Sequence, residues 1–287
     1  MRRRDFIRNV AAGAGASALL RPGAVLAEDP RDQTVVAADR TPIIDAHCHA
    51  GHGVNFGKLD GPHDPWTTFN DPVETLRKME EVGIDRTVIF PINNVTYESA
   101  NETIAEYVRR WPKKLIGFAK HDSKTEDGKI ADLLRHEVND LGLSGLKLHG
   151  TPTEEMMVTA SELKIPILFH PARVDDCHVA VRAHPEVNFI LAHLGSFASR
   201  RWRDHDRAIL VTQQYPNVYL ETSSVVFYRY LEKAARELPA DKLIFGSDGP
   251  LVDCRIELQK MRMLRLNPEA ERMVLGGNIL RLLGEHS

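Results

Sequence analysis

Short apolar runs alternate with longer segments of helical periodicity along most of the chain. Eight runs are rich in Val, Ile, Leu and Phe and have the length of buried strands; they cover residues 42–49, 84–91, 114–120, 143–149, 165–170, 187–193, 217–221 and 242–248. The segments between them include residues 71–82, 99–111, 127–140 and 200–215, which read as helices. Strand and helix alternating in this way predict a parallel sheet that is buried on both faces.

The number of repeats decides between two parallel-sheet architectures. Eight strand–helix units in about 240 residues have the size of a closed α/β barrel, the (β/α)8 or TIM barrel. The alternative is an open doubly wound sheet, which would call for a glycine-rich loop after an early strand, and the sequence contains no G-x-G-x-x-G motif. We therefore expect a (β/α)8 barrel over residues 42–287.

One connection is longer than the others. Residues 50–70, between the first strand and the first helix, are rich in Gly, Pro, Asp and aromatic residues. Loops of this length within a compact domain are often lids or binding loops. We expect this loop to cover the catalytic mouth of the barrel.

The N-terminal residues have the pattern of an export signal. Arg2, Arg3 and Arg4 precede Phe6 and a stretch rich in Ala, Gly and Leu, and small residues follow as far as Ala27. The paired arginines resemble the twin-arginine signal, which exports folded proteins. We expect residues 1–27 to be the signal and residues 28–41 a linker. The protein would then be periplasmic or secreted, with no stable membrane insertion after the signal is removed.

The net charge of the chain limits the kinds of molecule that it is expected to bind. The chain has 37 basic and 40 acidic side chains, and residues 1–27 contain five Arg and one Asp, so the remainder carries 32 basic and 39 acidic groups and a net charge of −7. Such a chain, without a long basic run, is a poor binder of nucleic acid or of anionic membranes. A small-molecule substrate is the expected partner, and homo-oligomerisation stays open.

The three cysteines do not form a recognisable framework. Cys48, Cys177 and Cys254 are scattered and odd in number, and no CxxC pair exists. We expect them to be small buried apolar residues.

Histidines and an aspartate gather at the ends of the predicted strands. Side chains alternate along a strand, so Asp45, His47 and His49 are expected to share one face of the first strand. His170, His193 and Asp248 end the fifth, sixth and eighth runs. Barrel enzymes place their sites at this end of the strands, and imidazole and carboxylate are ligands that zinc prefers. The sequence therefore predicts a divalent-metal site with a position left open for water.

The order of these motifs resembles the amidohydrolase superfamily, and within it the amidohydrolase 2 group of hydrolases, lactonases and nonoxidative decarboxylases. The resemblance runs from residue 42 to residue 283 and rests on Ile44-Asp-Ala-His-Cys-His, Gly145-Leu-Lys-Leu-His, His193-Leu-Gly, Asn217-Val-Tyr-Leu-Glu-Thr, Gly246-Ser-Asp-Gly-Pro and Gly277-Asn-Ile-Leu-Arg-Leu-Leu. Each motif is short, but their order along the chain is specific.

The resemblance implies roles for individual residues. His47, His49, His170 and Asp248 would ligate the metal, and Asp248 would also carry the proton between the water and the leaving group. His193 would act as a general acid or base or as a donor to the developing oxyanion.

The number of metals depends on Lys147. In binuclear relatives a carboxylated lysine on the fourth strand bridges two ions, and Lys147 with His193 would then hold the second ion. We favour one metal, most simply zinc, with Lys147 and His149 facing the substrate. Arg173 is a further candidate, since its planar guanidinium could hold a substrate carboxylate.

The expected chemistry is hydrolysis of an amide, lactone or ester-like bond by a metal-activated water. The alternative is a nonoxidative decarboxylase or lyase that acts on a small carboxylic acid. A non-catalytic binding protein on a degenerate barrel is disfavoured, because the full set of ligand-type residues is retained.

Overall fold

The computed structural model describes residues 41–54 and 69–285. The expected export signal and nearly all of the expected linker lie outside the described residues, and so does most of the predicted lid. In the described part of the chain, no helix is long and apolar enough to span a bilayer.

The strands form two sheets. The first has the order β2-β1-β3-β4 and the second the order β10-β9-β8-β7-β6-β5, and all neighbours are parallel except β1 and β2. The strands are β1 (Ile44–His52), β2 (Phe69–Asn70), β3 (Arg86–Pro91), β4 (Leu115–Gly117), β5 (Ala119–Lys120), β6 (Leu146–His149), β7 (Ile167–His170), β8 (Phe189–Leu191), β9 (Val218–Glu221) and β10 (Leu243–Ile244). The eight predicted runs are thus all strands, with β4 and β5 sharing the third run.

Backbone hydrogen bonds bridge both seams between the two sheets. At one seam β4 and β5 are a single strand interrupted at Phe118, whose N–H donates to Ile89 O at 2.9 Å. At the other seam Ala46 N–H donates to Phe245 O at 3.0 Å and Asp248 N–H to His47 O at 2.7 Å. The strand ladders leave the ring open at these two places, and the hydrogen bonds across them complete the predicted eight-stranded (β/α)8 arrangement.

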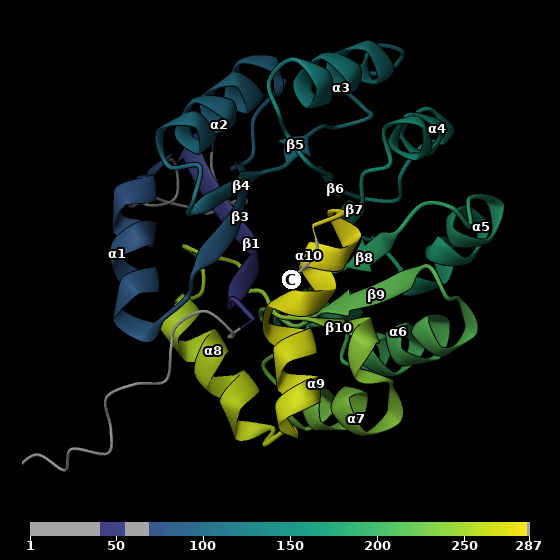
Figure 1. Cartoon of the computed structure of the whole chain (residues 1–287). Helices are drawn as coiled ribbons and strands as arrows, with labels where there is room; N and C mark the ends of the chain where they lie inside the picture. The colour runs from purple at the N-terminus through teal and green to yellow at the C-terminus, as the bar shows by residue number, and fades with distance from the viewer. Residues whose placement is uncertain (1–40, 55–68, 286–287) are drawn as a thin grey trace, which may run out of the picture. The chain divides into compact units, whose positions relative to one another are not determined.

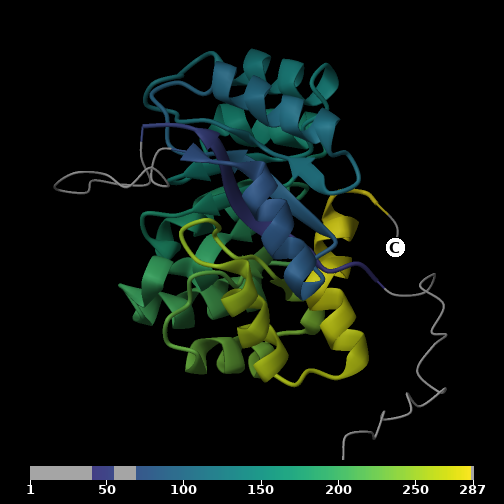
Figure 2. The ribbon, with the colours of Figure 1, turned by 90° about the vertical axis from the view of Figure 1, so that its left-hand side faces the viewer.

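Helices α1 to α8 surround the strands (Figure 1), and Figure 2 shows the same layers from the side. The helices are α1 (Pro72–Val82), α2 (Glu98–Arg110), α3 (Ile130–Asn139), α4 (Glu154–Leu163), α5 (Cys177–Ala183), α6 (Arg203–Gln214), α7 (Arg229–Glu237), α8 (Cys254–Met263), α9 (Pro268–Arg272) and α10 (Asn278–Leu282). The four predicted helical stretches correspond to α1, α2, α3 and α6. Asp71 caps α1, since its side chain accepts a hydrogen bond from Val73 N.

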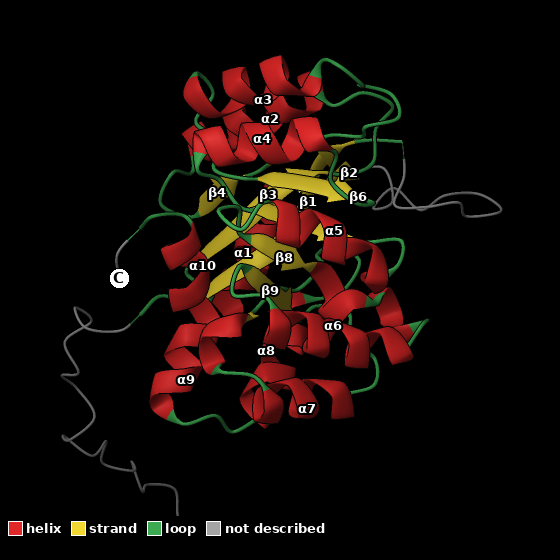
Figure 3. Cartoon of the chain, turned by 90° about the vertical axis from the view of Figure 1, so that its right-hand side faces the viewer, coloured by secondary structure: helices red, strands yellow, loops and turns green. Residues whose placement is uncertain are grey.

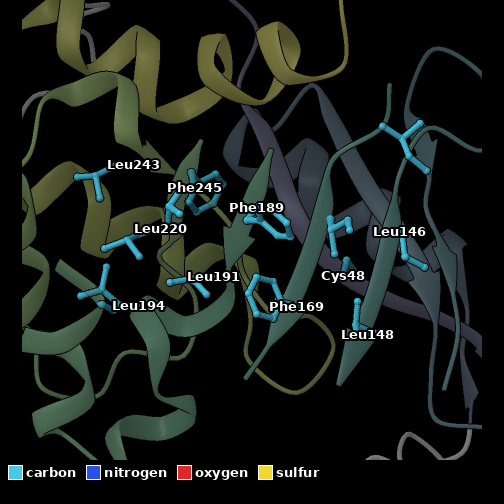
Figure 4. Packing of buried hydrophobic residues seen from close by; sticks show 14 of the residues in the cluster. Cys48, Leu146, Leu148, Phe169, Phe189, Leu191, Leu194, Leu220, Leu243 and Phe245 are labelled. Carbon is cyan, nitrogen blue, oxygen red and sulfur yellow. The ribbon is translucent and has the colours of Figure 1, made fainter. Parts of the chain in front are cut away.

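Successive side chains of each strand point to opposite faces, and the apolar ones therefore form two separate layers. On β7, for example, Leu168 packs in an inner cluster and Phe169 in an outer one. Figure 4 shows part of the outer cluster, which lies between the strands and the helices. Cys48, Cys177 and Cys254 are buried free thiols, so the prediction for the three cysteines is confirmed.

Helix α10 closes the end of the barrel at which the strands begin. Ile279, Leu280 and Leu282 join the inner cluster together with Ile44 and Ile244 near the strand starts. Figure 3 shows α9 and α10 at one end of the strands and β2 at the other. Because the start of the barrel is filled with side chains, the strand ends are left as the place for a ligand.

Candidate metal centre

A bulge in β1 decides where its two histidines point. The register of β1 with β3 shifts between Asp45 and Cys48, and both of these residues line a small cavity against α1 and the start of α8. His47 and His49 instead approach one oxygen of Asp248. The prediction that Asp45 shares their face is wrong, because the bulge breaks the alternation of side chains.

Asp248 contacts both histidines of β1 and has an unusual backbone conformation. Its Oδ1 lies 3.3 Å from His47 Nε2 and 3.5 Å from His49 Nε2, and its Oδ2 accepts a hydrogen bond from Ser224 Oγ at 2.7 Å. Its φ is 62°, in the left-handed region that non-glycine residues rarely occupy. Such residues cluster at functional sites, where the surroundings hold them in place.

His193 occupies a similar turn after β8. Its φ is 58°, and its ring centroid lies 4.9 Å from that of His47. The ring Nδ1 is 2.9 Å from Ser223 Oγ, and the backbone N–H donates to Glu221 Oε2 at 3.1 Å. The ring and the backbone of His193 are therefore both fixed from β9 and the turn that follows it.

Glu221, the last residue of β9, links the two histidines. Its Oε2 lies 3.0 Å from His47 Nδ1 and also accepts from Ser223 Oγ at 2.9 Å. A carboxylate at Nδ1 favours the tautomer with the proton on that nitrogen and leaves Nε2 free to bind a metal. Glu221 is absent from the site residues predicted from the sequence, although it ends an apolar strand run just as His170 and Asp248 do.

Burial controls protonation throughout this cluster. It lowers the pKa values of His47, His49 and His193 well below the ordinary range of histidine, so these rings are neutral. Burial also raises the pKa of Asp248 to about 8. A neutral imidazole offers a lone pair to a cation, and a cation next to Asp248 would offset the cost of its buried charge.

These residues fit a divalent ion. One ligand atom from each of His47, His193 and Asp248 lies within 4.8 Å of the other two, and all three residues are buried. Within the described residues, His47 Nε2 is buried and has no hydrogen-bond partner. A buried, unsatisfied nitrogen is costly, and metal ligation would satisfy it.

His170 lies outside this tight group. Its ring centroid is 5.0 Å from that of His193 and 6.0 Å from that of His149. Burial, assisted by the charge of Lys147, lowers its pKa to about 4. Its role as a metal ligand therefore stays a prediction.

The remaining predicted residues fall in different places. Lys147 is fully buried in β6, and its Nζ lies 5.5 Å from the ring centroid of Phe90. His149, two residues further along β6, has its ring centroid 6.4 Å from that of His49. Arg173 has a side chain that is 66% exposed and points towards Asp175, at 3.7 Å. Arg173 is not among the residues that line the cavity beside His149 and His170, so its contact with substrate stays a prediction.

A cavity of about 470 Å³ opens beside the histidines. His149 and His170 line its inner side, and Phe197 provides an aromatic wall. The charged groups that line it are Lys124, Arg200 and Arg201. None of the described residues lining it carries a carboxylate, so the cavity suits an anion.

A family model described as amidohydrolase matches residues 44–284. The chain belongs to the amidohydrolase family. It is an enzyme of that family, and the resemblance found in its motifs is confirmed.

Two kinds of amidohydrolase are among the similar proteins. The gamma-resorcylate decarboxylase of Polaromonas sp. (strain JS666) is 26% identical over 248 residues, which cover 61% of this chain and 76% of the relative. The solved structures include a dihydroxybenzoic acid decarboxylase from Polaromonas sp. JS666 with bound manganese and the inhibitor 2-nitroresorcinol. It has a TM-score of 0.62 and 18% identity, over 85% of this chain and 97% of that one.

A second solved structure is a probable 2-pyrone-4,6-dicarboxylic acid hydrolase from Acinetobacter baumannii. Its TM-score is 0.64 and its identity 14%, over 84% of this chain and 99% of that one. At these identities, the two structures support the barrel fold rather than a particular reaction.

Proposed function

We propose that this amidohydrolase is a divalent-metal-dependent, nonoxidative decarboxylase of a small aromatic carboxylic acid. The observation that carries the proposal is the cavity beside the histidines. Lys124, Arg200 and Arg201 can attract a carboxylate, and the Phe197 ring, 5.2 Å from that of His193 between centroids, can pack against an aromatic ring. The named activity of the 26% identical relative supports the same reaction.

This proposal reverses the order of the two reactions expected from the sequence. The sequence pattern favoured hydrolysis over decarboxylation. The similarity to curated proteins favours the decarboxylase alternative. Hydrolysis is kept as the second candidate, because His47, His49 and Asp248 are also the groups that a metal-activated water requires.

The proposed ion would be held by His47, His193 and Asp248, with His49 next to the same Asp248 oxygen. When bound, a divalent ion would act as a Lewis acid that polarises an oxygen of the substrate. Zinc is the ion expected from the sequence, and manganese is the ion in one structural neighbour. Metal analysis of the purified protein would decide between them, and would also decide between one ion and two.

The chain's own residues would position the acid and move one proton. The cationic side chains would bind the substrate, and Phe197 would orient its ring. In the reaction a proton adds to the carbon that bears the carboxylate; the bond to that carboxylate then breaks, CO₂ leaves, and the bonding electrons stay with the ring. Asp248, beside His47 and His49, is the acid placed to deliver that proton and to regain one from solvent.

The test is a substrate screen that follows two products in parallel. Hydroxylated benzoates, lactones and amides are offered to the metal-loaded protein, and both CO₂ and hydrolysis products are measured. Asp248→Asn should keep the fold and lose turnover, whereas Asp206→Asn, at a partly exposed position of α6, should keep both. Hydrolysis without CO₂ release would refute the decarboxylase, and an active Asp248→Asn enzyme would refute the role of Asp248.

We also propose that residues 1–27 direct export through the twin-arginine route. Replacing Arg3 and Arg4 by Lys in the full chain should retain the protein in the cytoplasm, as measured by fractionating cells and immunoblotting. Equal periplasmic amounts of the original and substituted chains would rule this route out.

A further inference from the structure

Two lysines lie side by side on the inner face of the barrel. Lys120 of β5 and Lys147 of β6 are directly paired in the strand register, and each is at most 1% exposed. Their strand neighbours Ala119, Leu146 and Leu148 pack in the outer cluster, so both lysines point inwards. Like charges paired across two strands destabilise a sheet, and burial lowers the pKa values of both lysines, so holding both amines charged is costly without a compensating partner.

The contacts of both amines are electrically neutral. Lys120 Nζ donates to Pro91 O at 3.1 Å and to Asn93 Oδ1 at 2.8 Å. Lys147 Nζ faces the ring of Phe90 and has no hydrogen-bond partner among the described residues. A buried amine without a partner carries a large desolvation cost.

The carboxylates closest to Lys147 are engaged elsewhere. Glu221 is bound to His47, to the backbone of His193 and to Ser223. Asp248 contacts His47 and His49 and accepts from Ser224. Among the described residues, neither carboxylate forms an ion pair with a lysine, so both amines are available to an anionic group of the substrate.

Neither lysine lines the cavity itself, but Lys147 lies on the strand that contributes His149 to its wall. Lys147 is two residues before His149 on the same strand, and His149 lines the cavity; residues at this spacing share one face of a strand. The charge of Lys147 also acts on His170, the other histidine of the cavity wall. A lysine has a flexible four-carbon stem, so its amine can turn towards a bound anion.

We infer that Lys120 and Lys147 bind a second anionic group of the substrate, and that the site therefore takes a small dianionic acid. One carboxylate is held by the cations that line the cavity, which are Lys124, Arg200 and Arg201. The second anionic group is held by the lysine pair. This inference rests on the proposed function, because it places the acid in the same cavity. The reaction removes one carboxylate as CO₂, and the group held by the lysine pair keeps its charge throughout.

The inference can be tested by equilibrium binding, without turnover. Isothermal titration calorimetry compares benzene-1,3-dicarboxylate with its monomethyl ester, which has a similar size and one charge fewer, in the presence and absence of added metal. The unchanged chain should bind the diacid roughly tenfold or more tightly than the ester, since hydrogen bonds to charged groups are strong. In Lys147→Met and in Lys120→Met, this preference should fall to about twofold or less.

Two further measurements separate a binding role from a structural one. Lys113→Met, at an exposed position, should keep the full preference for the diacid. Lys147→Met should unfold at a higher temperature than the unchanged chain, because an unpaired buried amine is replaced by an apolar side chain of similar length. Lys147→Gln provides a second variant with a polar side chain, and it should also lose the preference.

Three results would overturn the inference: equal affinity for the diacid and the ester in the unchanged chain, a preference that survives in the lysine variants, or a Lys147→Met chain that does not fold. Failure of the proposed function gives a different pattern. In that case the lysine-dependent preference for the diacid would remain, while no carboxylic acid released CO₂.

Discussion

Glu221 binds two candidate metal ligands with one carboxylate oxygen, which contacts His47 Nδ1 and the backbone N–H of His193. Replacing Glu221 by Gln keeps the size of the side chain but puts an amide where the carboxylate accepts hydrogen bonds. Loss of the carboxylate that orients a metal-binding histidine typically lowers metal affinity about 10- to 100-fold. We expect a decrease in metal affinity of this size for Glu221→Gln, measured by competition with a chelating dye.

A matched control for this substitution is available on α8. Glu257 is also buried, and its carboxylate pairs with Lys260 at 2.7 Å. Glu257→Gln should change metal affinity by less than about threefold, within the context dependence of such effects. If both variants lost affinity equally, Glu221 would act only through general stability.

At the scale of elements, one buried histidine connects the loop after β5 to α2 and α3. The ring of His121 contacts Glu126 at 3.1 Å and Glu137 at 2.7 Å, and Glu137 accepts from Asn101 of α2 at 2.6 Å. Burial disfavours the charged ring, but the hydrogen bonds with the two carboxylates outweigh it and raise the pKa of His121 to about 9.

This raised pKa predicts a pH-dependent stability. Because the folded pKa exceeds the ordinary value of 6.5, the stabilisation is complete below about pH 6.5 and is lost as the pH rises through about 9. Its size is on the order of 3 kcal/mol. Urea unfolding between pH 6 and pH 9.5 should therefore show His121→Gln losing less stability with rising pH than the unchanged chain.

Subtracting the variant from the unchanged chain removes the titration of other buried groups. His136→Gln is the surface control, since His136 pairs with Asp140 where both side chains are exposed, and it should follow the unchanged chain. A constant free-energy difference between the unchanged chain and His121→Gln across this range would contradict the prediction.

The strand and helix pattern was predictable because each element buries a continuous apolar surface. All eight apolar runs became strands, and the lengths of α1 and α2 were close to those expected. The bulge between Asp45 and Cys48 could not be predicted, since it arises from pairing with β3 and leaves no trace in the local pattern. The plug formed by α10 depends on contacts with strands more than 200 residues earlier in the chain, such as that with Ile44.

Candidate site residues were predictable where a ligand-type side chain ended a strand, as with His193 and Asp248. Lys120 also ends a strand run, but a lysine at that position reads equally well as a solvent-exposed residue. Only the pairing of β5 with β6 places it beside Lys147. The function of such a residue follows from the neighbours that the fold provides, and the sequence around it does not reveal them.

At the scale of the whole molecule, the candidate metal centre joins distant parts of the chain. His47 lies within the bulge of β1, and His193 follows β8. Asp248 lies after β10 and donates its backbone N–H to His47 O of β1. Only the folded barrel brings these groups together, so a bound ion should stabilise the folded state alone. At a free metal concentration about 1,000 times the Kd, the expected gain is about 4 kcal/mol.

This gain should appear as a higher unfolding temperature. For a chain of this size, 4 kcal/mol corresponds to a rise on the order of 10 °C. Manganese is the preferred probe, because zinc also binds the three cysteines of the unfolded chain, which would reduce the effect. Thermal unfolding of chelator-treated protein, with and without added manganese, measures the rise.

Two variants connect the temperature shift to the proposed centre. His47→Ala should unfold at the same temperature with and without manganese, whereas His136→Ala on the exposed side of α3 should keep the full rise. An equal rise in His47→Ala would place the bound ion elsewhere on the protein. No rise in the unchanged chain, with no stoichiometric metal after reconstitution, would remove the metal from the mechanism. Binding of the acid would then depend on the cationic side chains that the structure places at the cavity.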